Sequence, residues 1–313
     1  MLSSMRVIDA QLHEPTITLD WSASDVATRR RLLTEVELAT MDAVGVDCAV
    51  LYPVDLEWAA EVVAEHRERF AVVPAFAPGG VLTGFTPTGG NSGIDPLAPD
   101  VGDQIEALAA RPGWVGLRLM DVRTLPPPPA GQSPYALFDR ALRACQTLRV
   151  PVFMSTAGAL QAPAELTRRY PDLTLVVDHL GIRQPPSFPR DEPPFATLPD
   201  LLALAGLPNV AVKLSGAPTL SEQDYPYPDL WPHLRRVVDA FGPNRIMWGS
   251  DISRITGQIG FDVTFPAAGD RYPGKHTYAQ AVGYLRDCAD LTPSEKRWLL
   301  GATAQKILGW PAD

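Results

Sequence analysis

The segment Leu173–Gly181 reads LTLVVDHLG, an apolar run that ends in polar residues and a glycine. Short runs of this form are typical of strands buried on both faces of a parallel sheet. The segments around it have the same form: VPVFMS at Val150–Ser155, NVAVKLSG at Asn209–Gly216 and RIMWGSD at Arg245–Asp251. We therefore expect a series of parallel strands that carry polar side chains at their carboxyl ends.

Four more runs of this kind lie earlier in the chain: RVIDAQLH at Arg6–His13, DCAVLYP at Asp47–Pro53, FAVVPAFAP at Phe70–Pro78 and WVGLRLM at Trp114–Met120. Helical patterns such as Asp25–Val44 separate them, and successive runs start 23 to 44 residues apart, which is enough for a crossover helix. Eight such units predict an α/β fold, a (β/α)8 TIM barrel with long βα loops, formed by residues 1–313 as a single domain. An open doubly wound sheet is the alternative, but no Gly-rich turn follows the first run.

The amino-acid composition limits the kinds of molecule that the protein is expected to bind. Of 313 residues, 27 are basic and 36 acidic, giving a net charge of −9, and no basic run is longer than 29–31. This balance argues against nucleic acid and anionic membranes, which need a basic surface. Three widely spaced cysteines and the absence of a signal-like or membrane-spanning apolar run predict a cytoplasmic protein with a small-molecule substrate.

In a parallel barrel the carboxyl ends of the strands line one mouth, where the active site of such enzymes lies. The polar residues at these ends are therefore the candidates for the site. In chain order they are Gln11, His13, Tyr52, Arg118, Ser155, His179, Lys213, Ser215 and Asp251.

Several of these residues sit in motifs that resemble the amidohydrolase superfamily. The matching segments are VIDAQLH at Val7–His13, VVDHLG at Val176–Gly181, NVAVKLSG at Asn209–Gly216, FGPNRIMWGSD at Phe241–Asp251 and LLGATAQKILGW at Leu299–Trp310. The resemblance is to the amidohydrolase-related (amidohydrolase 2) branch, which contains lactonases acting on fuconolactone-like and pyrone-dicarboxylate lactones and also aromatic-acid decarboxylases. It implies a barrel enzyme that acts on a small molecule.

The sequence departs from the metal-dependent members of this superfamily, which carry His-x-His on the first strand and a further His on the fifth. Here Gln11 and Ser155 stand at those positions, while His13, His179 and Asp251 are kept. A neutral amide is a poor zinc ligand, so we expect no tightly bound metal and no other cofactor. The alternative is one divalent ion such as Zn²⁺ held by His13, His179 and Asp251.

The retained groups suit metal-free hydrolysis of an ester. His13, His179 and the Gln11 amide are expected to donate hydrogen bonds to a developing oxyanion, and Asp251 to take a proton from the attacking water. We therefore assign catalytic roles to Asp251, His179 and His13.

The other candidates are assigned to substrate binding. Arg118 and Lys213 suit an anionic substrate, although an internal ion pair with Asp9 or Asp178 would explain them equally well. Tyr52 and Ser155 are weaker candidates, and Asp178 is expected to face away from His179 as its strand neighbour. Arginines in the loops, such as Arg254 and Arg271, are expected to be mostly solvated.

These residues predict a hydrolase that opens a carboxylated or hydroxylated lactone with water activated by Asp251. One alternative is a metal-dependent decarboxylase of an aromatic or unsaturated acid, and another is a barrel that binds a small molecule without turning it over. A homo-oligomer is compatible with each of these three functions.

Overall fold

The computed structural model describes residues 5–15, 25–77, 93–120, 133–185, 188–256, 258–259, 263–264 and 276–310. Its strands are β1 (Ile8–Leu12), β2 (Cys48–Leu51), β3 (Phe70–Val72), β4 (Ala75–Phe76), β5 (Gly93–Ile94), β6 (Leu117–Leu119), β7 (Val152–Met154), β8 (Leu175–Val177), β9 (Val210–Lys213), β10 (Ile246–Met247), β11 (Gln258–Ile259) and β12 (Val263–Thr264). Its α-helices are α1 (Val26–Val44), α2 (Leu56–Glu65), α3 (Val101–Ala109), α4 (Asp139–Leu148), α5 (Gln161–Arg169), α6 (Leu198–Ala203), α7 (Trp231–Phe241), α8 (Ile252–Thr256), α9 (Tyr278–Arg286), α10 (Pro293–Arg297) and α11 (Thr303–Leu308).

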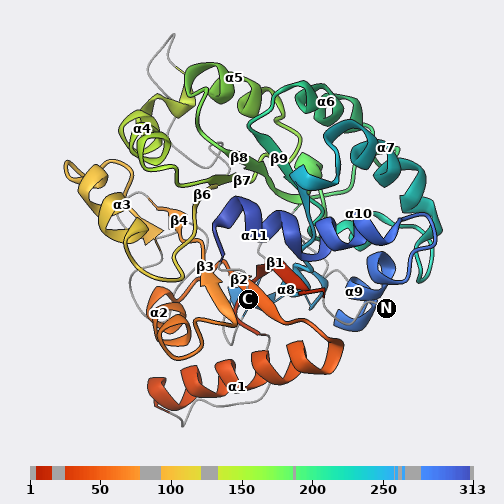
Figure 1. Ribbon diagram of the computed structural model, residues 1–313, viewed down its shortest axis with the longest axis horizontal. Helices are drawn as coiled ribbons and strands as arrows, with labels where there is room; N and C mark the ends of the chain where they lie inside the picture. Colours follow the sequence, from red (N-terminus) through yellow and green to blue (C-terminus); the bar gives the residue numbers. More distant parts are fainter. Residues whose placement is uncertain are drawn as a thin grey trace.

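The parallel strands form two ladders, β1-β2-β3 and β10-β9-β8-β7-β6-β4-β5. Backbone hydrogen bonds join the ladders at both seams. At one seam Val72 accepts from Val115 and donates to Gly113; at the other, Ala10 donates to Trp248 over 3.1 Å. The strands therefore close into the predicted (β/α)8 barrel, with helices around the outside (Figure 1).

The third predicted strand is interrupted. The run Phe70–Pro78 forms two short strands, β3 and β4, separated by Pro74. Proline has no N–H to give to a ladder, and the Pro74 carbonyl still accepts from Arg118 N. The interruption is therefore local, and the chain order of the barrel is as predicted.

Capping residues close to the helix ends define where several of the outer helices begin and end. Asp25 caps α1 by accepting from Thr28 N, and Gly45 ends that helix in the left-handed conformation at φ 74°. Thr292 and Glu295 form the reciprocal capping box before α10 that their spacing suggests. Within the part of the chain that the structure describes, no helix is long and apolar enough to cross a membrane.

Alternate strand residues fill the barrel interior. Val50, Tyr52, Phe153, Val176 and Met247 share one buried cluster with Ala304, Leu308 and Trp310 from the C-terminal segment. In Figure 1 helix α11 lies across the strands at the centre of the molecule. This apolar cluster therefore fills one end of the barrel, and polar side chains lie at the other end, where the strands have their carboxyl ends.

The long loops predicted after the third and eighth strands, 78–100 and 253–275, lie largely outside the described residues. The loop after the sixth strand, 182–194, is described except for 186–187. It contributes Gln184, which is 1% exposed, to the surroundings of the site.

Candidate active site

The three residues predicted to be catalytic lie together at one end of the barrel, although they come from positions far apart in the chain. His13 Nε2 lies 3.6 Å from Asp251 Oδ1, and His179 Nδ1 lies 3.5 Å from Asp251 Oδ2. The Asp251 side chain is 2% exposed. This convergence is what the alignment of parallel strand ends predicts.

The backbone after β8 places both Asp178 and His179 at the site. The strand ends at Val177, and Asp178–Gly181 forms a 3-10 turn in which His179 and Leu180 have φ of 55° and 59°. The prediction that Asp178 faces away from His179 is therefore wrong, because side chains alternate only while the backbone stays extended. Asp251 also has a positive φ, 51°, at the end of its strand segment.

Asp178 binds two cations inside the barrel mouth. Arg118 Nε donates to Asp178 Oδ2 over 2.8 Å, and Lys213 Nζ lies 2.8 Å from Oδ1. Burial raises the pKa of Asp178, but Lys213 and Arg118 outweigh it and lower the pKa to about 2. Lys213 therefore forms the internal ion pair that was the alternative to a role in substrate binding. Its side chain is fully buried, with 0% of the residue exposed.

Lys213 also fixes the orientation of two further predicted site residues. Its Nζ donates to Tyr52 Oη over 2.8 Å and to Gln11 Oε1 over 2.5 Å. The Gln11 amide nitrogen consequently faces His13 Nε2 at 3.1 Å. Gln11 and His13 therefore share a face, as the strand period predicts.

The partners of the two imidazoles define their tautomers. His13 Nδ1 lies 2.6 Å from the Tyr52 carbonyl, which can only accept, so the proton is on Nδ1 and Nε2 accepts from Gln11. His179 Nε2 faces Arg118 Nη2 at 3.1 Å and accepts, so Nδ1 donates to Ser215 Oγ over 2.7 Å. The prediction that these imidazoles donate to an oxyanion does not fit this arrangement, because each N–H already has an acceptor.

Burial keeps both imidazoles neutral. It lowers the pKa of His13 to about 4, against the opposing effect of Asp251. Burial together with Arg254 lowers the pKa of His179 to about 3. Burial alone would raise the pKa of Asp251, but Arg254 and the two imidazoles hold it well below the usual range. At neutral pH the site therefore contains an ionised carboxylate between two neutral rings.

Arg254 is a site residue that the sequence predicts only as one of several loop arginines. Its side chain was expected to be solvated, yet the residue is 6% exposed and its Nε donates to Asp251 Oδ2 over 2.5 Å. The signal was present in the sequence, since a cation three residues after an acid meets it on one turn of a helix, here at the start of α8. Arg271, another loop arginine, lies outside the described residues.

Ser155 stands apart from this network. It is half-buried after β7, and within the described ranges its side chain forms no hydrogen bond or ion pair with His13, His179 or Asp251. Its backbone N–H donates to Leu119 O over 3.1 Å.

The donor set does not fit a metal ion in this arrangement. Asp251 Oδ2 and His179 Nε2, two of the atoms such an ion would need, both face guanidinium groups. Among the described residues no group of three or more His, Cys, Asp or Glu side chains is placed to hold a metal. The charge of a divalent cation at this carboxylate would add to that of Arg254 and Arg118 nearby.

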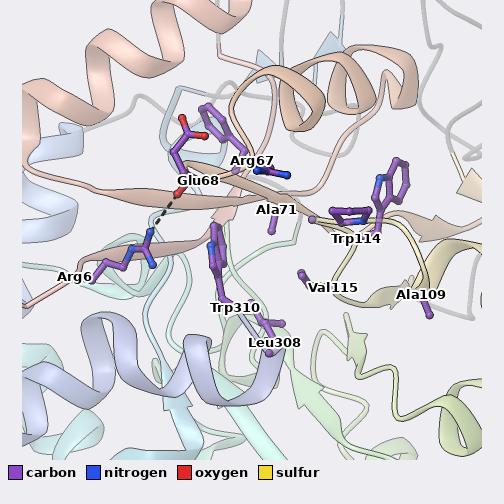
Figure 2. A pocket seen from close by; sticks show the side chains of 13 residues that line it. Arg6, Arg67, Glu68, Ala71, Ala109, Trp114, Val115, Leu308 and Trp310 are labelled. Atoms are coloured by element: carbon purple, nitrogen blue, oxygen red, sulfur yellow. Dashed lines mark hydrogen bonds between the residues drawn. The ribbon is translucent and has the colours of Figure 1, made fainter. Parts of the chain in front are cut away.

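The described residues line a cavity at each end of the barrel. A small one of about 20 Å³, room for about one water molecule, is lined by His13, Tyr52, Arg118 and Met120 among others. A larger one of about 660 Å³ lies beside the C-terminal segment, where Trp114, Leu308 and Trp310 line it with Arg6 at its edge (Figure 2). None of the predicted site residues lines the larger cavity, so the polar cluster and the small cavity define the candidate active site.

A parallel barrel with an ionisable cluster at the carboxyl ends of its strands has the architecture of the barrel enzymes. The family model described as amidohydrolase matches residues 8–310. The chain therefore belongs to the amidohydrolase family, as its motifs imply.

The curated relatives match parts of the chain. It is 37% identical over 124 residues to a 4-sulfomuconolactone hydrolase of Hydrogenophaga intermedia, covering 39% of each protein. It is 40% identical over 110 residues to an L-fucono-1,5-lactonase of Burkholderia ambifaria, covering 34% of this chain and 36% of that protein. The matched regions thus span well under half of the length of these relatives.

Among solved structures, a crystal structure of an amidohydrolase from Burkholderia multivorans with bound zinc has a TM-score of 0.67 at 19% identity. The comparison covers 98% of this chain and 100% of that one. At this identity the similarity establishes the fold alone.

Proposed function

We propose that this protein hydrolyses a lactone that carries an anionic or hydroxylated substituent, using water activated by Asp251 and no tightly bound metal. The relatives named as lactone hydrolases support the reaction class, because a segment of each is 37–40% identical to part of this chain. The polar cluster supports the mechanism, since it contains an acceptor for the proton of water and donors for a carbonyl oxygen.

The observation that carries the proposal is the ionised carboxylate of Asp251, whose Oδ1 lies 3.6 Å from His13 Nε2. The lone pair on His13 Nε2 accepts from the Gln11 amide, so Asp251 is the group that accepts a hydrogen of the attacking water. Such a water keeps an oxygen lone pair for attack on a carbonyl carbon. The small cavity lined by His13 and Arg118 lies next to this pair.

The donors for the developing oxyanion are the Gln11 amide and the Arg118 guanidinium. Lys213 holds Gln11 with its nitrogen toward His13, and Asp178 holds Arg118 through Nε. Donors that are already oriented need no reorganisation when charge develops on the oxygen.

In this reaction the water oxygen bonds to the carbonyl carbon while its proton passes to Asp251. The ring C–O bond then breaks, and Asp251 returns the proton to the leaving alkoxide. The product is the open-chain hydroxy acid. The low pKa of Asp251 makes it a weak base while Arg254 is paired with it, so the contact between these two residues influences the rate.

The test is a panel of carboxylated δ- and γ-lactones and hydroxylated sugar lactones, followed by proton release in weak buffer. We expect turnover of at least one anionic lactone by the wild-type protein and little by Asp251→Asn. Gas evolution from hydroxybenzoates without lactone turnover would favour a decarboxylase instead. Binding of the lactones without turnover would favour a binding barrel.

A further inference from the structure

The larger cavity lies at the amino-terminal end of the barrel, away from the polar cluster. Its volume of about 660 Å³ is in the range of small-molecule pockets in proteins. It is formed where β3 and β6 begin, beside the end of α11 (Figure 2). Barrel enzymes carry out their chemistry at the other end, so a molecule held here does not compete with a substrate for the polar cluster.

Two indole rings line this cavity. In the view of Figure 2, Trp114 and Trp310 lie on either side of Ala71 and Val115. Phe70, which also lines the cavity, is buried at the start of β3. Apolar walls that contain aromatic rings suit a planar aromatic ligand, which gains from burial and from stacked or edge contacts with indole.

The backbone holds Trp114 in place before any ligand binds. Val72 donates to the Gly113 carbonyl over 2.7 Å and accepts from Val115 N over 3.0 Å. These hydrogen bonds fix the main chain on both sides of Trp114. Gly113 has φ 83°, and a Cβ atom there would lie 2.3 Å from Val63 Cγ1, so the close approach to α2 requires glycine. Little further ordering of this wall is needed on binding.

The side-chain N–H groups at this cavity lack acceptors within the protein. Among the residues whose placement the structure gives, neither the indole N–H of Trp114 nor that of Trp310 donates a hydrogen bond, and the guanidinium of Arg67 forms no hydrogen bond or ion pair. Trp310 is only 6% exposed, so water has little access to its ring. A ligand that brings an acceptor therefore satisfies donors that the protein does not.

The charges at the cavity also favour an anion. The charged side chains that line it are Arg6, Arg67 and Glu68, so basic groups outnumber acidic ones here in a chain whose net charge is −9. Arg6 Nη2 donates to the Glu68 carbonyl over 3.3 Å, whereas Arg67 is exposed at the rim. A guanidinium beside apolar walls binds a carboxylate in a bidentate way.

We propose that this cavity is a second binding site, which takes an aromatic carboxylate. The aromatic ring lies against Trp114 and Trp310, and Arg67 binds the carboxylate. A primary amide of the same shape brings N–H donors to a lining that already has donors in excess, so it binds less tightly. The site is separate from the polar cluster, and the proposal does not depend on lactone hydrolysis.

The experiment is calorimetric titration with 2-naphthoate and 2-naphthamide, which share one ring system. We expect the wild-type protein to bind 2-naphthoate with a Kd about tenfold lower than that of 2-naphthamide. Arg67→Gln is expected to raise the Kd of 2-naphthoate to about that of the amide. Arg31→Gln, which removes an exposed arginine of α1 outside the lining, is the matched control and should keep the wild-type preference. Equal Kd values for the two probes in the wild-type protein would overturn the proposal.

A second variant tests where the probe binds. Ala109 is exposed at the end of α3 and lines the cavity, so Ala109→Trp fills the space from the solvent side. We expect this variant to bind both probes at least about tenfold more weakly, while Ala107→Trp, exposed on the same helix outside the lining, keeps wild-type binding. Melting curves show whether each variant is folded. Unchanged 2-naphthoate binding in folded Ala109→Trp would place the probe elsewhere and overturn the proposal, whether or not any lactone is hydrolysed.

Discussion

The ammonium group of Lys213 lies 2.5 Å from the side-chain oxygen of Gln11, and this contact decides which end of the amide faces the site. With its oxygen bound to Lys213, Gln11 presents its nitrogen to His13, and the resulting hydrogen bond requires an unprotonated Nε2. A buried lysine that binds Asp178 and Tyr52 as well as Gln11 therefore influences the tautomer of an imidazole next to the proposed water. Its role is to position other groups.

Replacement of Lys213 by methionine is expected to destabilise the protein by about 3–5 kcal/mol, because Asp178 loses one of its two buried cations. Chemical denaturation measures this change. Lys306→Met, on the exposed face of α11, is the matched control and is expected to change the free energy of unfolding by less than about 0.5 kcal/mol. Equal stability of the two variants would contradict the structural role of Lys213.

Replacement of Asp251 by asparagine is expected to lower kcat for lactone hydrolysis by about 100-fold or more, since the amide cannot take a proton from water. The ion pair between Arg254 and Asp251 is then lost, so the thermal midpoint should fall as well. Circular dichroism and a melting curve show whether the variant is folded at the assay temperature. Asp239→Asn, an exposed carboxylate on α7 paired with Arg235, is expected to retain full turnover. Wild-type kcat in Asp251→Asn would remove this residue from the mechanism.

The buried carboxyl group of Glu37 is expected to make the free energy of unfolding depend on pH. It is 1% exposed on α1, and burial with the nearby carboxyl groups Asp9 and Glu14 raises its pKa to about 8. The folded protein therefore keeps a proton that the unfolded chain loses above the ordinary pKa of 4.5. The stability from this group is complete below that value and is lost as the pH rises toward 8.

The variant Glu37→Gln cannot lose this proton, so its free energy of unfolding should fall less than that of the wild type between pH 5 and pH 8. Each unit of pKa shift corresponds to about 1.4 kcal/mol, so the difference is on the order of a few kcal/mol. Denaturation at a series of pH values measures it. Glu35→Gln, exposed on the same helix, should follow the wild-type curve. Parallel curves for wild type and Glu37→Gln would show that the buried carboxyl does not titrate in this range.

Removal of divalent metal is expected to leave lactone hydrolysis unchanged. Asp251 Oδ2 and His179 Nε2 face guanidinium groups, and His13 Nε2 accepts from the Gln11 amide, so these three atoms are engaged by donors. Metal analysis of the purified protein and turnover before and after dialysis against a chelator provide the measurement. Stoichiometric zinc or manganese whose removal abolishes turnover, with activity restored on adding it back, would contradict the metal-free mechanism.

Much of the barrel was predictable because the signals for it are local. The apolar runs that become β1, β2 and β6 to β10 are bounded by turn residues, and the cap at Thr292 depends on one residue three positions further on. The break at Pro74 and the 3-10 turn at Asp178–Gly181 were not anticipated. In the second case a change of φ at His179 reversed the expected direction of the Asp178 side chain.

The sequence by itself determined the strand segments, their order and the convergence of His13, His179 and Asp251. The pattern of apolar runs is enough to locate the strands, and the parallel direction of the strands brings their carboxyl ends to one side of the barrel. Only the tertiary structure decided which acceptor each cation meets. Lys213 reaches Gln11 across 202 positions of the chain, and Arg254 occupies space left by Gly216. Such contacts depend on distances of a few tenths of an ångström between remote segments. Local sequence patterns carry no information at that scale.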